Sequence, residues 1–186
     1  DLHANQIQGF FDIPVDNLFA APIFVQHIKK NIKSKNLVCV APDVGGVERA
    51  RAIAKRLSAD LAIIDKRRSG PGTSEVMNVI GDVRNKICVI IDDLVDSGGT
   101  IVNAAAALKS KGAKDVYAYV VHGVLTGEAV KKINTSKIKK FIISNSIMNT
   151  KKIKKSAKFQ TISVGTLFAE AIKRISISKS VSKLFK

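Results

Sequence analysis

The sequence lacks the features that mark several large classes of protein. It has no tryptophan, only two cysteines and four prolines among 186 residues, and no internal repeat or Gly/Ser/Pro-rich linker. Its apolar runs are shorter than the roughly 18 to 20 residues that cross a bilayer, which excludes a membrane-spanning helix. Apolar residues make up 46% and charged residues 25% of the chain. This composition is typical of one globular domain.

Initiator methionine, a basic stretch and an apolar stretch are all missing from the start, Asp1–Ala4. We therefore expect no secretory signal, and we expect the chain to be a piece of a longer protein. Both cysteines, Cys39 and Cys88, lie inside apolar runs and are interpreted as buried thiols of a reduced, cytoplasmic protein. A metal site built on them would need further ligands at short spacing, which the sequence does not supply.

Acidic residues are nearly absent from the C-terminal third. Residues 131–186 hold 15 Lys and Arg against one acid, Glu170, whereas residues 1–130 hold 16 against 14, and the formal net charge is +16. Few aromatic side chains accompany this charge, so base stacking has little support. A solvated lysine face is favoured over a nucleic-acid site. RNA binding, an acidic partner segment, and a simple bias toward Lys and Ile stay open as alternatives.

Short apolar runs alternate with segments of helical periodicity. The runs predict strands over 37–41, 61–64, 87–91, 116–121, 138–143 and 161–164. The periodic segments predict helices over 46–57, 100–111, 127–133 and 166–175. This alternation indicates right-handed crossovers and an α/β fold with a mainly parallel sheet flanked by helices. Ligands of such sheets bind beyond the carboxyl ends of the strands, so chemistry is expected just after Ala41, Ile64 and Ile91.

The segment that follows the third predicted strand has the composition of a sugar-phosphate site. Two glycines let the backbone approach an anion, and the amides at the start of the next helix are donors for a phosphate. The two adjacent carboxylates would accept hydrogen bonds from vicinal hydroxyls, directly or through a divalent cation. The candidate substrate-binding residues are Asp92, Asp93, Asp96, Ser97, Gly98, Gly99 and Thr100.

Other phosphate motifs do not fit this segment. Walker A needs a lysine where Thr100 stands, and the dinucleotide fingerprint needs Gly-x-Gly-x-x-Gly. A capped helix with an acidic turn is the alternative, but three aspartates at one strand end are costly unless they bind something.

Asp92–Thr100 resembles the ribose 5-phosphate loop of the type I phosphoribosyltransferase fold. Several nucleobase transferases share that loop. It therefore implies the fold and a sugar-phosphate ligand, but it does not specify which reaction the protein catalyses. Three more stretches, Asp1–Pro14, Ala41–Ala50 and Ile64–Val76, resemble segments of the ribose-phosphate pyrophosphokinases, as does Ser180–Phe185. The resemblance covers nearly the whole chain. It departs from the family at Ser97, where threonine is commoner, and in the lysine-rich C-terminal third.

The resemblance implies a reaction and residue roles. In the family, the anomeric hydroxyl of ribose 5-phosphate attacks the β-phosphorus of Mg-ATP, and AMP leaves. It implies that Lys66 is the catalytic lysine, that Arg68 contacts phosphates, and that His3 and Asp43 contact Mg²⁺. The residues themselves support a lid: Lys66-Arg67-Arg68 followed by Ser-Gly-Pro-Gly predicts a cationic arm on a flexible hinge, with a disordered basic loop as the alternative.

Domain organisation and assembly follow from the same resemblance. Residues 1–18 are expected to border a missing N-terminal domain, 19–175 to form the phosphoribosyltransferase-like domain, and 176–186 to pack on the missing domain or a subunit interface. A hexamer built of dimers is implied, and the fragment alone is expected to be inactive. The residues that match a phosphate-sensing allosteric site are Asn5, Gln8, Asp16 and Asn17. His27 and His122 receive no role.

Two alternative functions remain beside the pyrophosphokinase. A nucleobase phosphoribosyltransferase would share the sugar-phosphate loop, but it would not explain the segment Asp1–Pro14. A non-catalytic regulatory subunit would be expected to have lost the catalytic arm or the acidic pair, whereas Lys66, Arg68, Asp92 and Asp93 are all present.

Overall fold

The computed structural model describes residues 1–67 and 76–185. In these residues the strands form one sheet in the order β3-β2-β1-β4-β5-β6-β7. Neighbouring strands are parallel, except that β3 is antiparallel to β2. The strands are β1 (Leu37–Ala41), β2 (Asp60–Arg67), β3 (Val76–Ile80), β4 (Ile87–Val95), β5 (Asp115–Gly123), β6 (Lys140–Ser144) and β7 (Phe159–Ile162).

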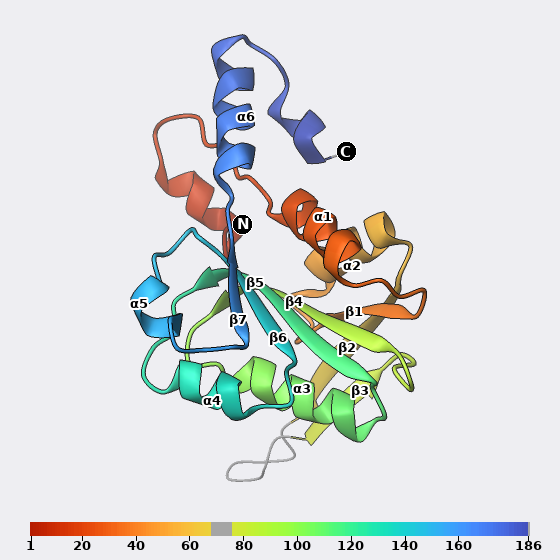
Figure 1. The fold of residues 1–186 in the computed structure, drawn as a ribbon. Coiled ribbons are helices and arrows are strands. Elements are labelled where there is room, and N and C mark those ends of the chain that lie inside the picture. Colours follow the sequence, from red (N-terminus) through yellow and green to blue (C-terminus); the bar gives the residue numbers. More distant parts are fainter. Residues whose placement is uncertain (68–75, 186) are drawn as a thin grey trace.

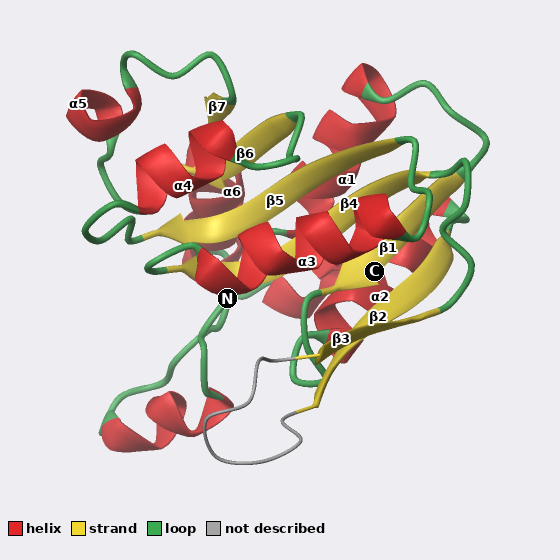
Figure 2. Cartoon of the chain, turned by 90° about the horizontal axis from the view of Figure 1, so that it is seen from below, coloured by secondary structure: helices red, strands yellow, loops and turns green. Residues whose placement is uncertain are grey.

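Helices cover both faces of the sheet (Figures 1 and 2). The α-helices are α1 (Ala21–Asn31), α2 (Val47–Leu57), α3 (Gly99–Ser110), α4 (Ala129–Thr135), α5 (Thr150–Ile153) and α6 (Gly165–Ser176), and two short 3-10 helices are η1 (Asn5–Phe10) and η2 (Val181–Phe185). Helices α1 and α2 pack on one face, and α3 and α4 pack on the other. Helix α6 follows β7 and extends away from the sheet (Figure 1). None of the helices described is long and apolar enough to cross a bilayer.

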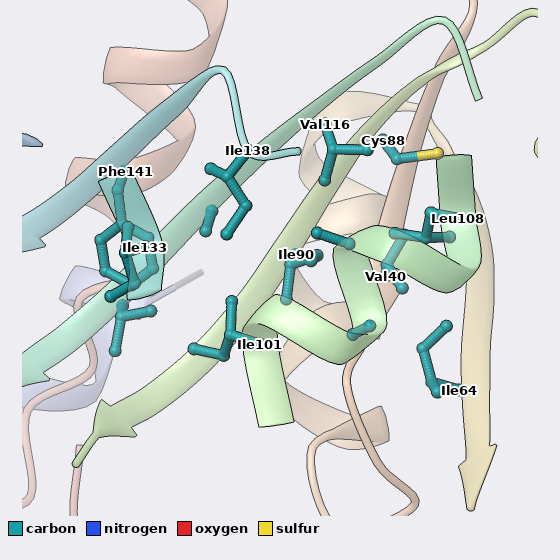
Figure 3. Packing of buried hydrophobic residues seen from close by; sticks show 14 of the residues in the cluster. Val40, Ile64, Cys88, Ile90, Ile101, Leu108, Val116, Ile133, Ile138 and Phe141 are labelled. Carbon is teal, nitrogen blue, oxygen red and sulfur yellow. The ribbon is translucent and has the colours of Figure 1, made fainter. Parts of the chain in front are cut away.

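The core consists of two apolar layers separated by the sheet. Because consecutive side chains of a strand point to opposite faces, Ile90 of β4 belongs to the layer under α3 and Ile91 to the layer under α1 and α2. Ile101 and Leu108 of α3 and Phe141 of β6 line the first layer (Figure 3). Central strands buried on both faces hold the carboxyl ends of β1 and β4 in fixed positions, and the candidate site lies there.

Both cysteines are buried free thiols, as predicted. Cys39 and Cys88 are fully buried, in different layers of the core. Burial raises the pKa of each thiol to about 12. Neither is therefore a reactive thiolate at neutral pH.

The predicted α/β fold with a mainly parallel sheet is confirmed, but several elements have other bounds than predicted, and two of these differences concern the site. Strand β2 extends to Arg67 and β4 to Val95, so the site residues near their ends lie within strands and not after them. Lys66 pairs with Met77 of β3, and Asp92 pairs with Val120 of β5. The polar side chains concealed these last residues of the strands, because backbone ladders do not require apolar side chains.

The two end segments lie against α1 and α2. The carboxylate of Asp1 accepts a hydrogen bond from the amide of Ala20 at 2.7 Å. The ring of Phe185 in η2 packs edge-on against Phe19 with 5.5 Å between ring centroids, and Arg56 of α2 donates to its backbone carbonyl. The prediction that these segments border a further domain stays a prediction.

Several lysines of the basic third bind backbone carbonyls. Lys158 Nζ donates to the carbonyls of Ile133 and Ser136, at 3.4 and 2.7 Å, where α4 ends. Lys152 Nζ donates to the carbonyl of Val124 at 3.1 Å, just after β5. Part of the positive charge in this region therefore stabilises the ends of helices and strands.

Candidate functional site

A cavity of about 190 Å³ lies where β1 and β4 end. The predicted substrate-binding residues and the predicted metal residues all line it. They are His3, Asp43, Asp92, Asp93, Asp96, Ser97, Gly98, Gly99 and Thr100. Side chains that are distant in the sequence therefore meet here, because parallel strands end at the same edge of the sheet.

The glycine turn between β4 and α3 presents backbone donors to this cavity. Gly98 has a φ of +78°, a left-handed conformation that glycine adopts without strain. Helix α3 begins at Gly99 with no side-chain cap on its first amides. Its uncapped amides and its dipole favour an anion at this end. Asp96 has a different part: its carboxylate accepts a hydrogen bond from Thr126 Oγ1 at 2.7 Å and so ties the turn to the segment before α4.

Lys66 reaches the same turn from β2. Its Nζ donates a hydrogen bond to Thr100 Oγ1 at 3.1 Å. The ammonium thus lies beside a hydroxyl at the start of α3, although 34 residues separate the two in the sequence. The predicted arm is in part a strand, because Lys66 lies in the β2–β3 ladder. Arg68 lies outside the described residues.

The acidic pair is nearly enclosed. The side chains of Asp92 and Asp93 are 14% and 5% exposed, and Asp93 Oδ1 accepts a hydrogen bond from the amide of Leu94 at 2.8 Å. Burial, followed by the charge of Asp93, raises the pKa of Asp92 to about 7. Burial also acts to raise the pKa of Asp93, but Arg49 and a hydrogen bond from His3 outweigh it and lower that pKa. The pKa values of the two neighbouring carboxyl groups therefore move in opposite directions.

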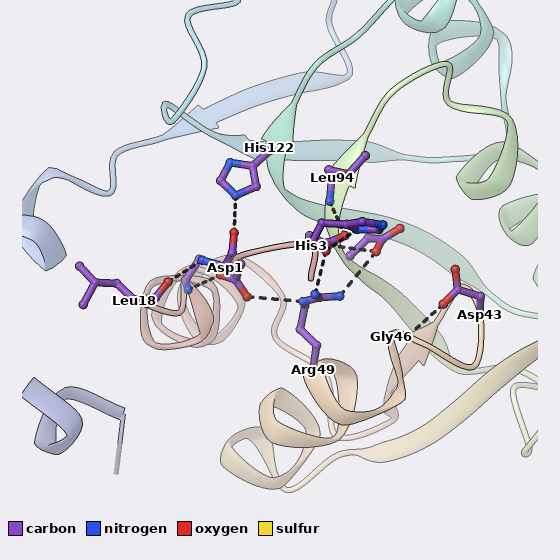
Figure 4. Close-up of polar contacts among 11 residues, drawn as sticks. Asp1, His3, Leu18, Asp43, Gly46, Arg49, Leu94 and His122 are labelled. Atoms are coloured by element: carbon purple, nitrogen blue, oxygen red, sulfur yellow. Dashed lines mark hydrogen bonds and ion pairs between the residues drawn. The ribbon is translucent and has the colours of Figure 1, made fainter. Parts of the chain in front are cut away.

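Arg49 of α2 is a site residue that the sequence analysis did not identify. Its guanidinium lies 3.0 Å from Asp93 Oδ2, 3.7 Å from Asp92 Oδ1 and 3.4 Å from Asp1 Oδ1 (Figure 4). The sequence feature that could have indicated its role is a basic residue in the first turn of the helix after Asp43. Only the fold shows that this turn faces the end of β4.

His3 and Asp43 flank the acidic pair. His3 Nδ1 lies 3.0 Å from Asp93 Oδ2, and Asp43 Oδ1 accepts a hydrogen bond from the amide of Gly46 at 2.9 Å (Figure 4). The described residues contain no group of three or more His, Cys, Asp or Glu side chains arranged to hold a metal ion. Any cation at this cavity would need most of its ligands from a bound substrate or water.

His122 contacts the N-terminal segment that borders the site. Its Nε2 donates to the backbone carbonyl of Asp1 at 2.7 Å, and its Nδ1 lies 2.9 Å from the hydroxyl of Ser146. The imidazole therefore anchors the N-terminal segment that carries His3. Burial lowers the pKa of His122, which favours this neutral form.

The four predicted allosteric residues lie on the N-terminal segment. Gln8 Nε2 donates to the carbonyl of Asn5 at 3.3 Å, and Asn5 lines a second cavity of about 390 Å³ between this segment, α2 and η2. Asp16 and Asn17 follow on the same segment, before α1. Their assignment to an effector site stays a prediction.

Comparisons with known sequences show the family to which the chain belongs. Residues 68–186 match the model of the phosphoribosyl synthetase-associated domain family. The chain is 55% identical, over 185 residues, to the ribose-phosphate pyrophosphokinase of Bradyrhizobium diazoefficiens and 56% identical to that of Rhizobium meliloti. The match covers 100% of this chain, and 58% and 60% of those two relatives. The chain therefore spans less than two thirds of their length.

One solved structure has a similar fold. The phosphoribosylpyrophosphate synthetase of Mycobacterium smegmatis superposes with a TM-score of 0.86 at 35% sequence identity. The superposition covers 96% of this chain and 57% of that one. The α/β architecture is therefore that of a type I phosphoribosyltransferase-like domain.

Proposed function

Because the chain belongs to the phosphoribosyl synthetase-associated domain family, we propose that it is part of a ribose-phosphate pyrophosphokinase. The whole protein would transfer the β,γ-diphosphoryl group of Mg-ATP to the anomeric hydroxyl of ribose 5-phosphate. Phosphoribosyl diphosphate for nucleotide biosynthesis and AMP would be the products. One observation carries the proposal: uncapped amides and an acidic pair line one small cavity, and the Lys66 ammonium donates to Thr100 Oγ1, which belongs to that lining.

The proposed binding of ribose 5-phosphate divides between two ends of the cavity. The amides and hydroxyls of Ser97–Thr100 would take the phosphate, because uncapped helix amides and the dipole favour an anion. Asp92 and Asp93 would accept hydrogen bonds from the ribose hydroxyls, which carboxylates bind well. This arrangement would hold the anomeric hydroxyl toward the open side of the cavity.

Lys66 and Arg68 are proposed to act on the polyphosphate. In phosphoryl and diphosphoryl transfer, catalysis is mainly positioning together with neutralisation of charge on the phosphoryl oxygens. Lys66 Nζ donates to Thr100 Oγ1 at 3.1 Å, at the start of α3, so the ammonium lies next to the proposed site of ribose 5-phosphate, which the polyphosphate of ATP must approach for the reaction. The role of Arg68 rests on the resemblance alone.

Mg²⁺ is the proposed cofactor, and His3 and Asp43 are the residues that would hold it. Asp43 supplies a hard oxygen ligand and His3 a weaker nitrogen ligand, and both line the cavity. Mg²⁺ in nucleotide sites is commonly bound through one or two side chains, substrate phosphates and water, and two protein ligands fit that pattern. When bound, the ion would neutralise charge on the phosphates of ATP.

Assembly and location complete the proposal. We place the protein in the cytoplasm, because two free buried thiols are typical of a reducing compartment. A hexamer built of dimers, with the phosphate-sensing residues Asn5, Gln8, Asp16 and Asn17 at a subunit boundary, follows from the family resemblance. Phe10 and Ile13 on the same segment are 86% and 69% exposed, and such apolar exposure is typical of an interface.

Two measurements test the function. Titration calorimetry of the 186-residue chain with ribose 5-phosphate should detect binding, Asp92→Asn should weaken it, and Asp82→Asn on the exposed turn after β3 should leave it unchanged. The whole protein should release AMP from Mg-ATP and ribose 5-phosphate, whereas the 186-residue chain alone should not turn over. Absence of both ribose 5-phosphate binding and AMP release would reject the proposal. Base-dependent release of diphosphate from phosphoribosyl diphosphate would instead favour the nucleobase transferase.

A further inference from the structure

Arg49 is the basic side chain through which several carboxylates of the site are joined. Its Nη2 donates to Asp93 Oδ2 at 3.0 Å, its Nη1 lies 3.7 Å from Asp92 Oδ1, and its Nε lies 3.4 Å from Asp1 Oδ1. Among the described residues, the other basic group within ion-pair distance of Asp93 is His3. The Arg49 side chain is 21% exposed, so these contacts are partly shielded from water.

The backbone around Arg49 is fixed on both sides. Ala50 and Ile53, on the same helix, are 0% and 1% exposed in the layer between α2 and the sheet. The turn that enters α2 is closed by the hydrogen bond from the Gly46 amide to Asp43 Oδ1. The guanidinium therefore projects from a rigid helix start toward the end of β4. Its forked donors suit two neighbouring carboxylates better than a single ammonium would.

The contacts give the two aspartates different tasks. Asp93 Oδ2 is shared by Arg49 and His3, and its Oδ1 accepts the Leu94 amide. Three of its roughly four acceptor positions are thus used within the protein. Asp92 accepts the amide of Asp93 through Oδ1 at 2.9 Å, and Arg49 Nη1 lies 3.7 Å from the same oxygen. The contacts therefore hold Asp93 more firmly than Asp92, and both side chains line the cavity.

We propose that Arg49 is a positioning residue that orients the Asp92–Asp93 pair for the hydroxyls of the bound sugar. This inference rests on the proposed function, since it assumes that ribose 5-phosphate occupies the cavity. Two adjacent carboxylates at a buried strand end repel each other, and a buried charge without a partner is unfavourable. The Arg49 guanidinium opposes that repulsion and keeps the Asp93 side chain turned toward α2. Without it, the pair would lose the single arrangement in which Asp92 faces the cavity.

The test compares two ligands on the same variants of the 186-residue chain. Ribose 5-phosphate needs both the loop and the carboxylates, whereas inorganic phosphate needs only the loop. Arg49→Gln should weaken ribose 5-phosphate binding about tenfold or more, and it should change the affinity for inorganic phosphate by less than about twofold. Arg49→Lys keeps the charge without the forked donors and should fall between. Arg51→Gln, at an exposed position of the same helix, should match the wild type.

Each other outcome has a definite meaning. If Arg49→Gln weakens both ligands equally, Arg49 supports the loop as a whole and the positioning role is wrong. If it weakens neither, the role is also wrong. If Arg49→Gln still weakens binding about tenfold in the Asp93→Asn background, the effect does not pass through Asp93 and the inference fails. If the wild-type chain binds inorganic phosphate but not ribose 5-phosphate, the proposed function fails first, which separates the two failures.

Discussion

Replacement of Lys66 by methionine tests whether its ammonium stabilises the reacting phosphates. Methionine keeps most of the length of the side chain and removes the charge and the donor. The change deletes the hydrogen bond from Lys66 Nζ to Thr100 Oγ1, which measures 3.1 Å. The β2–β3 ladder at this position involves the backbone, so the strand itself should persist.

The size of the effect follows from the distance at which the Lys66 ammonium would meet the polyphosphate of ATP. A direct contact would place a phosphoryl oxygen about 3 to 4 Å from Nζ. At an effective dielectric constant of about 20, two unit charges 4 Å apart attract by about 4 kcal/mol. That energy corresponds to a loss of roughly a thousandfold in rate, within the range of about 10² to 10⁴ that covers such groups.

The assay is AMP release by the whole protein with saturating Mg-ATP and ribose 5-phosphate. We expect Lys66→Met to lower kcat by roughly a thousandfold and to change the affinity for ribose 5-phosphate much less. Lys86→Met is the matched control, because Lys86 pairs with Asp60 and Asp82 at the opposite end of β4. A kcat within about tenfold of the wild type, or an equal loss in Lys86→Met, would refute the reasoning.

Three further predictions concern the fold. Gly81→Ala should lower the free energy of unfolding in urea by about 2 kcal/mol or more, since Gly81 has a φ of +113° and an added Cβ would lie 3.0 Å from a backbone carbonyl; an unchanged midpoint would contradict this. Cys39 and Cys88 should not react with a thiol reagent at pH 8 unless the chain is unfolded, because burial raises both pKa values to about 12, and labelling of the native chain would contradict the assigned burial. Burial and the charge of Lys30 lower the pKa of His27 from its usual 6.5. The unfolded chain therefore binds this proton more tightly than the folded chain does. The stability that neutral His27 contributes is lost as the pH falls below about 6.5. His27→Gln should make the fall in unfolding free energy between pH 7.5 and 5 shallower, and an equally steep fall would exclude this role.

Much of the sheet was predictable because central parallel strands are buried on both faces and appear as continuous apolar runs. The run Leu37–Ala41 predicts β1 with its observed bounds. The antiparallel strand β3 was not predicted, although most of its residues are apolar, because Val76–Ile80 directly follows the glycine-rich stretch that was interpreted as a hinge. Helix α1 was also missed, since nothing before it indicates a start other than the proline at its second position.

The candidate site was predictable where its residues are adjacent in the sequence. The segment Asp92–Thr100 could be interpreted from composition, and all seven of the residues proposed from it line the cavity. The contact between Arg49 and Asp93 joins residues 44 positions apart. Only the packing of α2 against the sheet determines it. Local patterns identify donors and acceptors, whereas the long-range pairing that orients them depends on the fold.

The carbonyl contacts of Lys152 and Lys158 limit how the charge of this protein can be redesigned. To make the protein less basic, exposed lysines such as Lys154 and Lys155 could be replaced with little effect on folding. Such a variant would adhere less to polyanionic resins. Replacement of Lys158 would remove the donor to the Ser136 carbonyl just after α4, whereas the Ile133 carbonyl would still accept from Ser136. The isoelectric point of about 10 therefore arises in part from lysines that bind backbone carbonyls at the ends of helices and strands.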